Sequence, residues 1–241
     1  ILRPVYNRVY ATVRGWAPSR ELFSRLLRFG LPNGVQFFID IFGFTVFILL
    51  VGRLGTVQLT ATNIAFNINA LAFMPMLGLG VAVSVLVGQY LGENRVELAE
   101  RSVYSGAAVS FLYMGGIACA YVTVPDLFVS IFSPHTGQVG FESIREITIL
   151  LLRFVAIYSL FDTMNIVFAS AVKGAGDTRF VMFLIIAMSS VFLVIPSYLA
   201  LVIFKVGIYG AWIILSLYII LLGFCFLFRF LGGKWKSMRV I

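Results

Sequence analysis

The sequence predicts an all-α membrane protein with six transmembrane helices, and two observations support this prediction. First, 61% of the 241 residues are hydrophobic and only 12% are charged, whereas soluble domains carry about 25% charged residues. Second, the chain contains apolar stretches long enough to cross a bilayer as helices. This composition excludes a soluble globular domain and identifies the lipid bilayer as the surroundings of most side chains.

The expected spans are residues 29–51, 57–91, 99–124, 144–173, 178–204 and 208–231. The second stretch is too long for one straight crossing at about 1.5 Å per residue. It contains Pro75, and a kink there would shorten its reach. Splitting it would leave two pieces of about 16 residues, which is shorter than a crossing needs. We therefore expect one bent helix.

Both ends of the chain are basic. Residues 1–28 contain six arginines, and Leu22, Leu26 and Phe29 recur at helical spacing. This pattern indicates a basic amphipathic helix on the membrane surface, or a linker from an upstream half. Residues 232–241 form a second basic segment. Because the chain begins at Ile1 rather than Met, we expect it to be part of a longer protein.

The basic residues also predict the orientation in the cell membrane. One set of loops and ends carries most of them, and the opposite set carries only Arg53, Arg145, Arg153 and Lys205. The positive-inside rule places the richer set, with both termini, in the cytoplasm. The net charge of +8 therefore reflects loop asymmetry, and we expect no nucleic-acid partner.

The sequence indicates no catalytic site. Cys119 and Cys225 lie far apart in apolar runs, which is typical of small packing residues. The single histidine, His135, falls in the predicted outer loop, so no histidine pairs with serine or cysteine inside the membrane. Glycine pairs at 78–80 and 174–176 lack the strand–turn–helix setting of a dinucleotide site. The first pair favours close helix packing and the second ends a helix. We expect no enzyme activity and no cofactor.

Two acids interrupt apolar spans. Asp40 lies 12 residues after Arg28, and Asp162 lies 11 residues before Lys173. At 1.5 Å per residue both carboxylates lie about 16–18 Å from the cytoplasmic face. An acid in hydrocarbon is costly, and it indicates an ion or substrate pathway. The matched depth favours one shared site, although each acid could instead face a different polar neighbour.

Polar residues form stripes on three of the spans. They recur at helical spacing on the first span (Asn33, Gln36, Asp40), the second (Thr60, Asn63, Asn67) and the fourth (Tyr158, Asp162, Asn165). Such stripes need partners inside the protein because lipid offers none. They could form hydrogen bonds between helices or line a water-filled cavity, and the two carboxylates favour the cavity. Carboxylate and amide oxygens suit Na⁺ or protons, and the pattern does not choose between these ions.

Three stretches resemble a known family. LPNGVQFFID (31–40), ATNIAFNINALAFMPMLGLGVAVSVLVGQYLGENR (61–95) and FDTMNIVFASAVKGAGDTRF (161–180) are similar to the C-terminal half of MATE (multidrug and toxic compound extrusion) transporters. The resemblance implies a twelve-helix protein with two six-helix lobes. This chain would be the second lobe, and its partner would be the N-terminal lobe of the same transporter.

The NorM-like branch of that family also implies site residues. Its cation site uses acids of the seventh and tenth helices, which match Asp40 and Asp162, and Tyr158 falls where the branch lines this site. The seventh-helix acid is usually Glu, so Asp40 is one methylene shorter. The cavity-lining candidates are Asn33, Gln36, Asn63, Asn67 and Asn165. The resemblance implies no metal ion other than Na⁺, bound at the two acids.

The implied function is antiport coupled to Na⁺ or H⁺, with export of small organic compounds that are cationic and amphipathic. Two alternatives stay open. A lipid-linked saccharide flippase of the same superfamily would have a basic cavity, whereas the polar stripes here carry acids. A membrane scaffold that transports nothing would use the same stripes only to join its helices.

Overall fold

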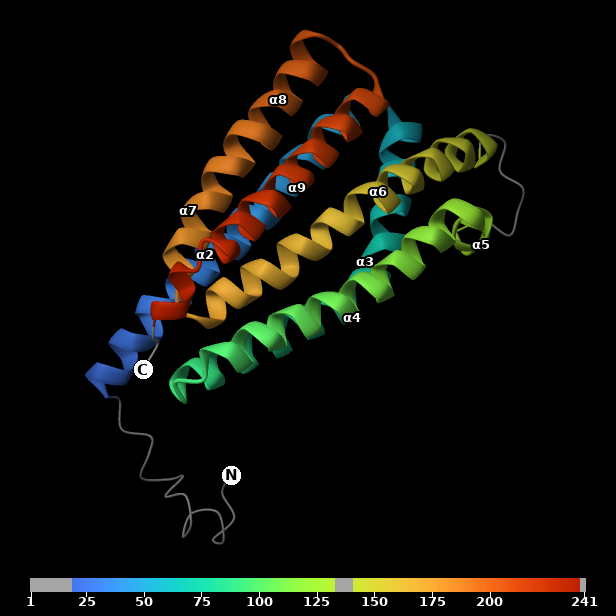
Figure 1. Ribbon diagram of the computed structural model, residues 1–241. Helices are drawn as coiled ribbons and strands as arrows, with labels where there is room; N and C mark the ends of the chain where they lie inside the picture. The colour runs from blue at the N-terminus through green and yellow to red at the C-terminus, as the bar shows by residue number, and fades with distance from the viewer. Residues whose placement is uncertain (1–18, 133–140, 239–241) are drawn as a thin grey trace, which may run out of the picture.

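The computed structural model describes residues 19–132 and 141–238, which are almost entirely helical (Figure 1). The first four of the six long segments are single helices: α2 (Arg20–Gly52), α3 (Thr56–Gly92), α4 (Val96–Thr123) and α6 (Phe141–Gly174). A fifth, Thr178–Ile203, runs through α7 and α8, and the sixth is α9 (Ile208–Leu231). These six segments are long and apolar enough to cross a membrane. The predicted fold class is therefore confirmed.

The fifth segment is the least regular. It consists of α7 (Thr178–Met188), a π-helical stretch (Ser189–Val194), α8 (Ile195–Tyr198) and a second π-helical stretch (Leu199–Ile203). Pro196 lies in α8, between the two π-helical stretches. Proline lacks a backbone N–H and crowds the preceding turn, which accounts for the change in hydrogen bonding around it. By contrast, α3 is one helix of 37 residues that includes Pro75.

The start of the first helix differs from the sequence prediction. Ser19 is its N-cap and accepts a hydrogen bond from the backbone N–H of Leu22 at 3.4 Å. Residues 20–28 are therefore continuous with the first span as one helix. The remaining part of the predicted linker, residues 1–18, lies outside the described residues, as do His135 and the last three residues of the chain.

A short helix, α5 (Pro125–Ser130), occupies the start of the stretch that we had predicted as an outer loop. At the opposite end of the lobe, Arg229 of α9 pairs with Asp177, the residue before α7. The Arg229 Nε donates to Asp177 Oδ2 at 3.0 Å, and its guanidinium lies 4.1 Å from the ring centre of Phe180. This ion pair holds the start of α7 against the end of α9.

Helix α6 lies at the centre of the bundle and packs against α3, α4 and α9, while α2 packs against the α7–α8 segment (Figure 1). Small residues allow the close approaches. A Cβ on Gly174 would collide with the backbone of Ser84 on α3, and a Cβ on Gly223 would lie 2.6 Å from the carbonyl oxygen of Phe161 on α6. Close backbone contact through glycine is typical of membrane helices.

Trp212 of α9 joins three helices. Its indole Nε1 donates to Thr62 Oγ1 of α3 at 3.3 Å, and its ring stacks on Phe66 with centroids 5.2 Å apart. On α6, the rings of Phe154 and Tyr158 both lie 6.4 Å from it. The Trp212 side chain is fully buried, so the hydrogen bond to Thr62 avoids the cost of an unpaired indole N–H.

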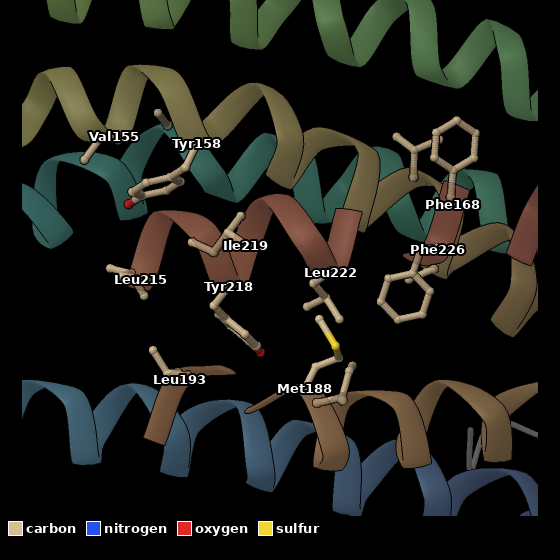
Figure 2. Close-up of a cluster of buried hydrophobic side chains, with 14 of the residues drawn as sticks. Val155, Tyr158, Phe168, Met188, Leu193, Leu215, Tyr218, Ile219, Leu222 and Phe226 are labelled. Atoms are coloured by element: carbon tan, nitrogen blue, oxygen red, sulfur yellow. The ribbon is translucent and has the colours of Figure 1, made fainter. Parts of the chain in front are cut away.

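A second cluster of buried side chains lies between α9 and the α2–α7 pair. Figure 2 shows Tyr218 extending from α9 toward these helices, with Met188 and Leu193 pointing back at α9. All three side chains are buried, and Tyr218 is only 2% exposed. The cluster therefore connects the irregular fifth segment to the centre of the lobe.

We predict that Gly174→Ala destabilises the lobe, since the new methyl group must displace the Ser84 backbone of α3. Overpacking of this kind costs about 1–3 kcal/mol. The measurement is the apparent Tm of the purified full-length protein in detergent. Gly78→Ala is the matched control, because Gly78 also lies inside a helix, α3, and a methyl group there would meet no neighbouring atom within 4 Å. Equal Tm values for the two variants would contradict the close packing of α3 on α6.

Candidate functional site

The first predicted acid is held by a residue of its own helix. Asp40 lies on α2, is half-buried, and accepts a hydrogen bond at Oδ2 from Gln36 Nε2 at 3.2 Å. Asn33 is exposed and lies on the same face of α2, seven residues before Asp40. Because the Gln36 amide nitrogen donates to the carboxylate, its amide oxygen is available as a further ligand.

The second predicted acid has a similar arrangement on α6. Asp162 is half-buried and accepts a hydrogen bond at Oδ1 from Asn165 Nδ2 at 3.1 Å. The Asn165 amide oxygen is likewise available to a ligand. Tyr158 lies one turn earlier and is only 2% exposed, with its ring against Trp212. The packing of Tyr158 therefore fixes the helix turn that carries Asp162.

The two carboxylates interact electrostatically with each other across the space between α2 and α6. Tyr218 of α9 interacts electrostatically with both acids. No hydrogen bond or ion pair joins the two acids directly among the residues that the structure describes. Their joint role as a cation site stays a prediction.

The polar stripe on α3 behaves differently. Asn67 Nδ2 donates to the backbone oxygen of Asn63 at 2.8 Å, within the same helix, and both side chains are exposed. Among the described residues neither asparagine has a hydrogen bond to Asp40 or Asp162. These two residues stay candidates for lining a cavity, and the structure does not join them to the acids.

Three polar residues of the bundle were not predicted as site residues. Tyr218 carries a hydroxyl group in the mostly apolar sixth span, and a search for polar groups inside the spans would have found it. Asn69 of α3 has a buried Oδ1 with no hydrogen-bond partner within the described part of the chain. The sequence prediction gave Lys173 no role at the site, although Lys173 follows Asp162 by three helical turns on the same face of α6.

A cavity of about 380 Å³ lies beside the ends of α2, α3 and α6. Its polar lining residues are Asn33, Ser84, Gln89, Lys173 and Thr178. A neighbouring cavity of about 260 Å³ shares Phe29 and Thr178 with it and adds Arg28, Asp177 and Arg179. Neither cavity is lined by Asp40 or Asp162, so the cavities lie toward the predicted cytoplasmic end of the lobe.

The chemistry of the acids suits a small hard cation. Carboxylate oxygens, with the free amide oxygens of Gln36 and Asn165, form an oxygen-only donor set. Within residues 19–132 and 141–238, no three His, Cys, Asp or Glu side chains come together as a metal cluster.

Comparison with protein families gives a match over most of the chain. Residues 32–199 match the family model described as MatE. The multidrug resistance protein MdtK of Yersinia pestis (strain Pestoides F) is 31% identical over 170 residues, which is 70% of this chain and 35% of that protein. MdtK of Proteus mirabilis (strain HI4320) is 30% identical over 183 residues, 75% of this chain and 38% of that protein. The chain therefore spans little more than a third of these relatives.

Solved structures show the same fold. A MATE protein in the bent conformation superposes with a TM-score of 0.81 at 19% identity, covering 97% of this chain and 52% of that chain. An outward-facing multidrug resistance MATE transporter of the MOP superfamily gives a TM-score of 0.82 at 19% identity, covering 97% and 53%. A MOP superfamily transporter of Pyrococcus furiosus gives 0.83 at 20% identity, also covering 97% and 53%.

We predict that water reaches the polar face of α2. In a full-length protein lacking native cysteines, Asn33→Cys and Gln36→Cys should react with a water-soluble methanethiosulfonate reagent. Phe38→Cys is the control, because Phe38 is 64% exposed yet lies on the opposite face of α2 from Asp40. Phe38→Cys should react at about one tenth of the rate of the other two variants, or more slowly, because the reactive thiolate does not form in hydrocarbon. Equally slow labelling at all three positions would favour the scaffold interpretation.

Proposed function

This chain belongs to the MatE family, and on that premise we propose that it is one lobe of an antiporter coupled to Na⁺ or H⁺. Proteins of this family are transporters rather than enzymes, and the relatives named above are multidrug resistance proteins. The proposed cargo is a small organic compound that is cationic and amphipathic. The proposed location is the cell membrane, with both chain ends in the cytoplasm.

One observation supports this function best: two half-buried acids, on α2 and α6, interact with each other and each accepts an amide N–H from its own helix. A carboxylate in a membrane-spanning segment is costly unless it binds a partner. A cation between Asp40 and Asp162 would supply that partner to both acids at once. We propose these two residues as the cation ligands. The buried Tyr158, one helical turn before Asp162, would help to fix the position of that acid.

The proposed transport cycle needs a second lobe. The chain covers 52% and 53% of the MATE structures named above, which supports an N-terminal six-helix lobe as its partner. Alternating access is then motion of one lobe against the other around a central site. Binding of the cation can drive this motion only if its affinity differs between the outward-facing and inward-facing states. Cation entering from outside would favour release of the organic compound outward.

We predict that Asp40→Asn and Asp162→Asn each abolish cation-driven efflux while the protein still inserts into the membrane. Loss of a charged ligand costs about 2 kcal/mol, which is roughly 30-fold in cation affinity. The measurement is ethidium efflux from cells expressing the full-length transporter, with membrane content checked by immunoblot. Glu97→Gln is the matched control, because Glu97 is an exposed acid in the first turn of α4.

Wild-type efflux by both asparagine variants would overturn the proposed cation site. The same variants separate the two other hypotheses. A saccharide flippase should lose transport of a lipid-linked saccharide rather than of ethidium, and a scaffold should show no efflux even without a substitution. Repeating the assay with a Na⁺ gradient at equal pH, and with a pH gradient free of Na⁺, identifies the coupling ion.

A further inference from the structure

Lys173 lies near the end of α6, on the helix that also carries Asp162. It follows Asp162 by 11 residues on α6, which is three turns at 3.6 residues per turn, so both side chains lie on the same helix face. Lys173 is half-buried and lines the cavity of about 380 Å³ at the end of α6. The face of α6 that carries Asp162 therefore reaches this cavity at Lys173.

The polar face of α2 reaches the same cavity. Asn33 lines the cavity together with Lys173. Asn33, Gln36 and Asp40 share one face of α2, and Gln36 is hydrogen-bonded to Asp40. On α2, a polar path thus runs from the cavity at Asn33 through Gln36 to Asp40. Lys173 and Asn33 lie at the mouth of this path, and Asp40 lies deeper.

The ammonium of Lys173 is not neutralised at its own end of the lobe. Other bases there form ion pairs: Arg229 with Asp177, and Lys236 with Glu100 at 2.7 Å. Within the described residues, Lys173 has no carboxylate oxygen within 4.0 Å. The acid with which it interacts electrostatically is Asp40. Burying an ammonium without a paired carboxylate costs free energy. A role in cation transport would explain why Lys173 occupies this position.

Building on the proposed function, we propose that Lys173 is a positioning residue, a tethered ammonium at the cytoplasmic mouth of the path that competes with the coupling cation for Asp40. A fixed positive charge lowers the affinity of a nearby acid for a second cation, and the effect is strong where water is scarce. The coupling cation must leave toward the cytoplasm in the proposed cycle. The Lys173 ammonium favours this release because it competes for Asp40, and it stays attached to the chain when the coupling cation leaves.

The test uses the full-length transporter in proteoliposomes, with ethidium as the organic cation. The driving cation is the one, Na⁺ or H⁺, that energises the unsubstituted protein. Lys173→Gln and Lys173→Met should lower the half-saturating concentration of the driving cation about three- to tenfold, the range expected for a partly screened charge pair. Both should also lower the maximal rate, because release to the cytoplasm becomes slower.

Two controls isolate the charge of Lys173 from other effects. Lys173→Arg keeps the charge and should keep both kinetic parameters. Arg101→Gln removes an exposed base from α4, away from the cavity, and should change neither parameter. A structural defect would lower the maximal rate alone, so the fall in half-saturating concentration is the decisive readout.

Three results would overturn the role of Lys173: unchanged half-saturation in Lys173→Gln and Lys173→Met, the same shift in Lys173→Arg, or the same shift in Arg101→Gln. Failure of the proposed function looks different, since Asp40→Asn would then retain wild-type dependence on the driving cation. If Asp40→Asn loses that dependence while both neutral variants at Lys173 match the unsubstituted protein, only the inference about Lys173 fails.

Discussion

The candidate site depends on the hydrogen bond between the Trp212 indole and the Thr62 hydroxyl. In a bilayer there is no hydrophobic driving force between helices, so shape, hydrogen bonds and close backbone contact determine how they pack. The indole N–H of Trp212 donates its hydrogen bond to α3, and the indole ring packs against Tyr158 on α6. Since Tyr158 lies one turn before Asp162, this single side chain sets the height and rotation of the acid-bearing turn relative to two neighbouring helices.

Aromatic contacts hold α2 against α3 at one end of the lobe, and a cavity lies between these helices at the other end. The rings of Phe44 and Phe47 on α2 contact Phe66 of α3, with centroids 6.1 Å and 6.3 Å apart. Both rings come after Asp40 on α2, on the side of the short connection to α3. On the other side of Asp40, α2 and α3 border a cavity that includes Asn33. The same aromatic contacts that hold the helices together therefore leave the opposite end accessible.

Local periodicity predicted the contacts that lie within one helix. Gln36 with Asp40 and Asp162 with Asn165 are four and three residues apart, and both pairs form hydrogen bonds. The contact of Trp212 with Thr62 joins residues 150 positions apart, and no local pattern specifies it. Tyr218 and Lys173 were missed for the same reason, since their proximity to the acids depends on how α9 and α2 pack. The start of α2 at Arg20 was also missed, because helical spacing does not reveal whether an amphipathic turn joins the next span.

The charges near the proposed site give the proposed exchange a simple physical basis. With both carboxylates ionised, Asp40 and Asp162 contribute two negative charges, and Lys173 contributes one positive charge. One negative charge then remains, and an uncompensated charge is unfavourable in surroundings of low dielectric constant. A single Na⁺, a single proton or one organic cation would each neutralise it. The coupling ion and the cargo would therefore compete for the same uncompensated charge, and this competition links the binding of one to the release of the other.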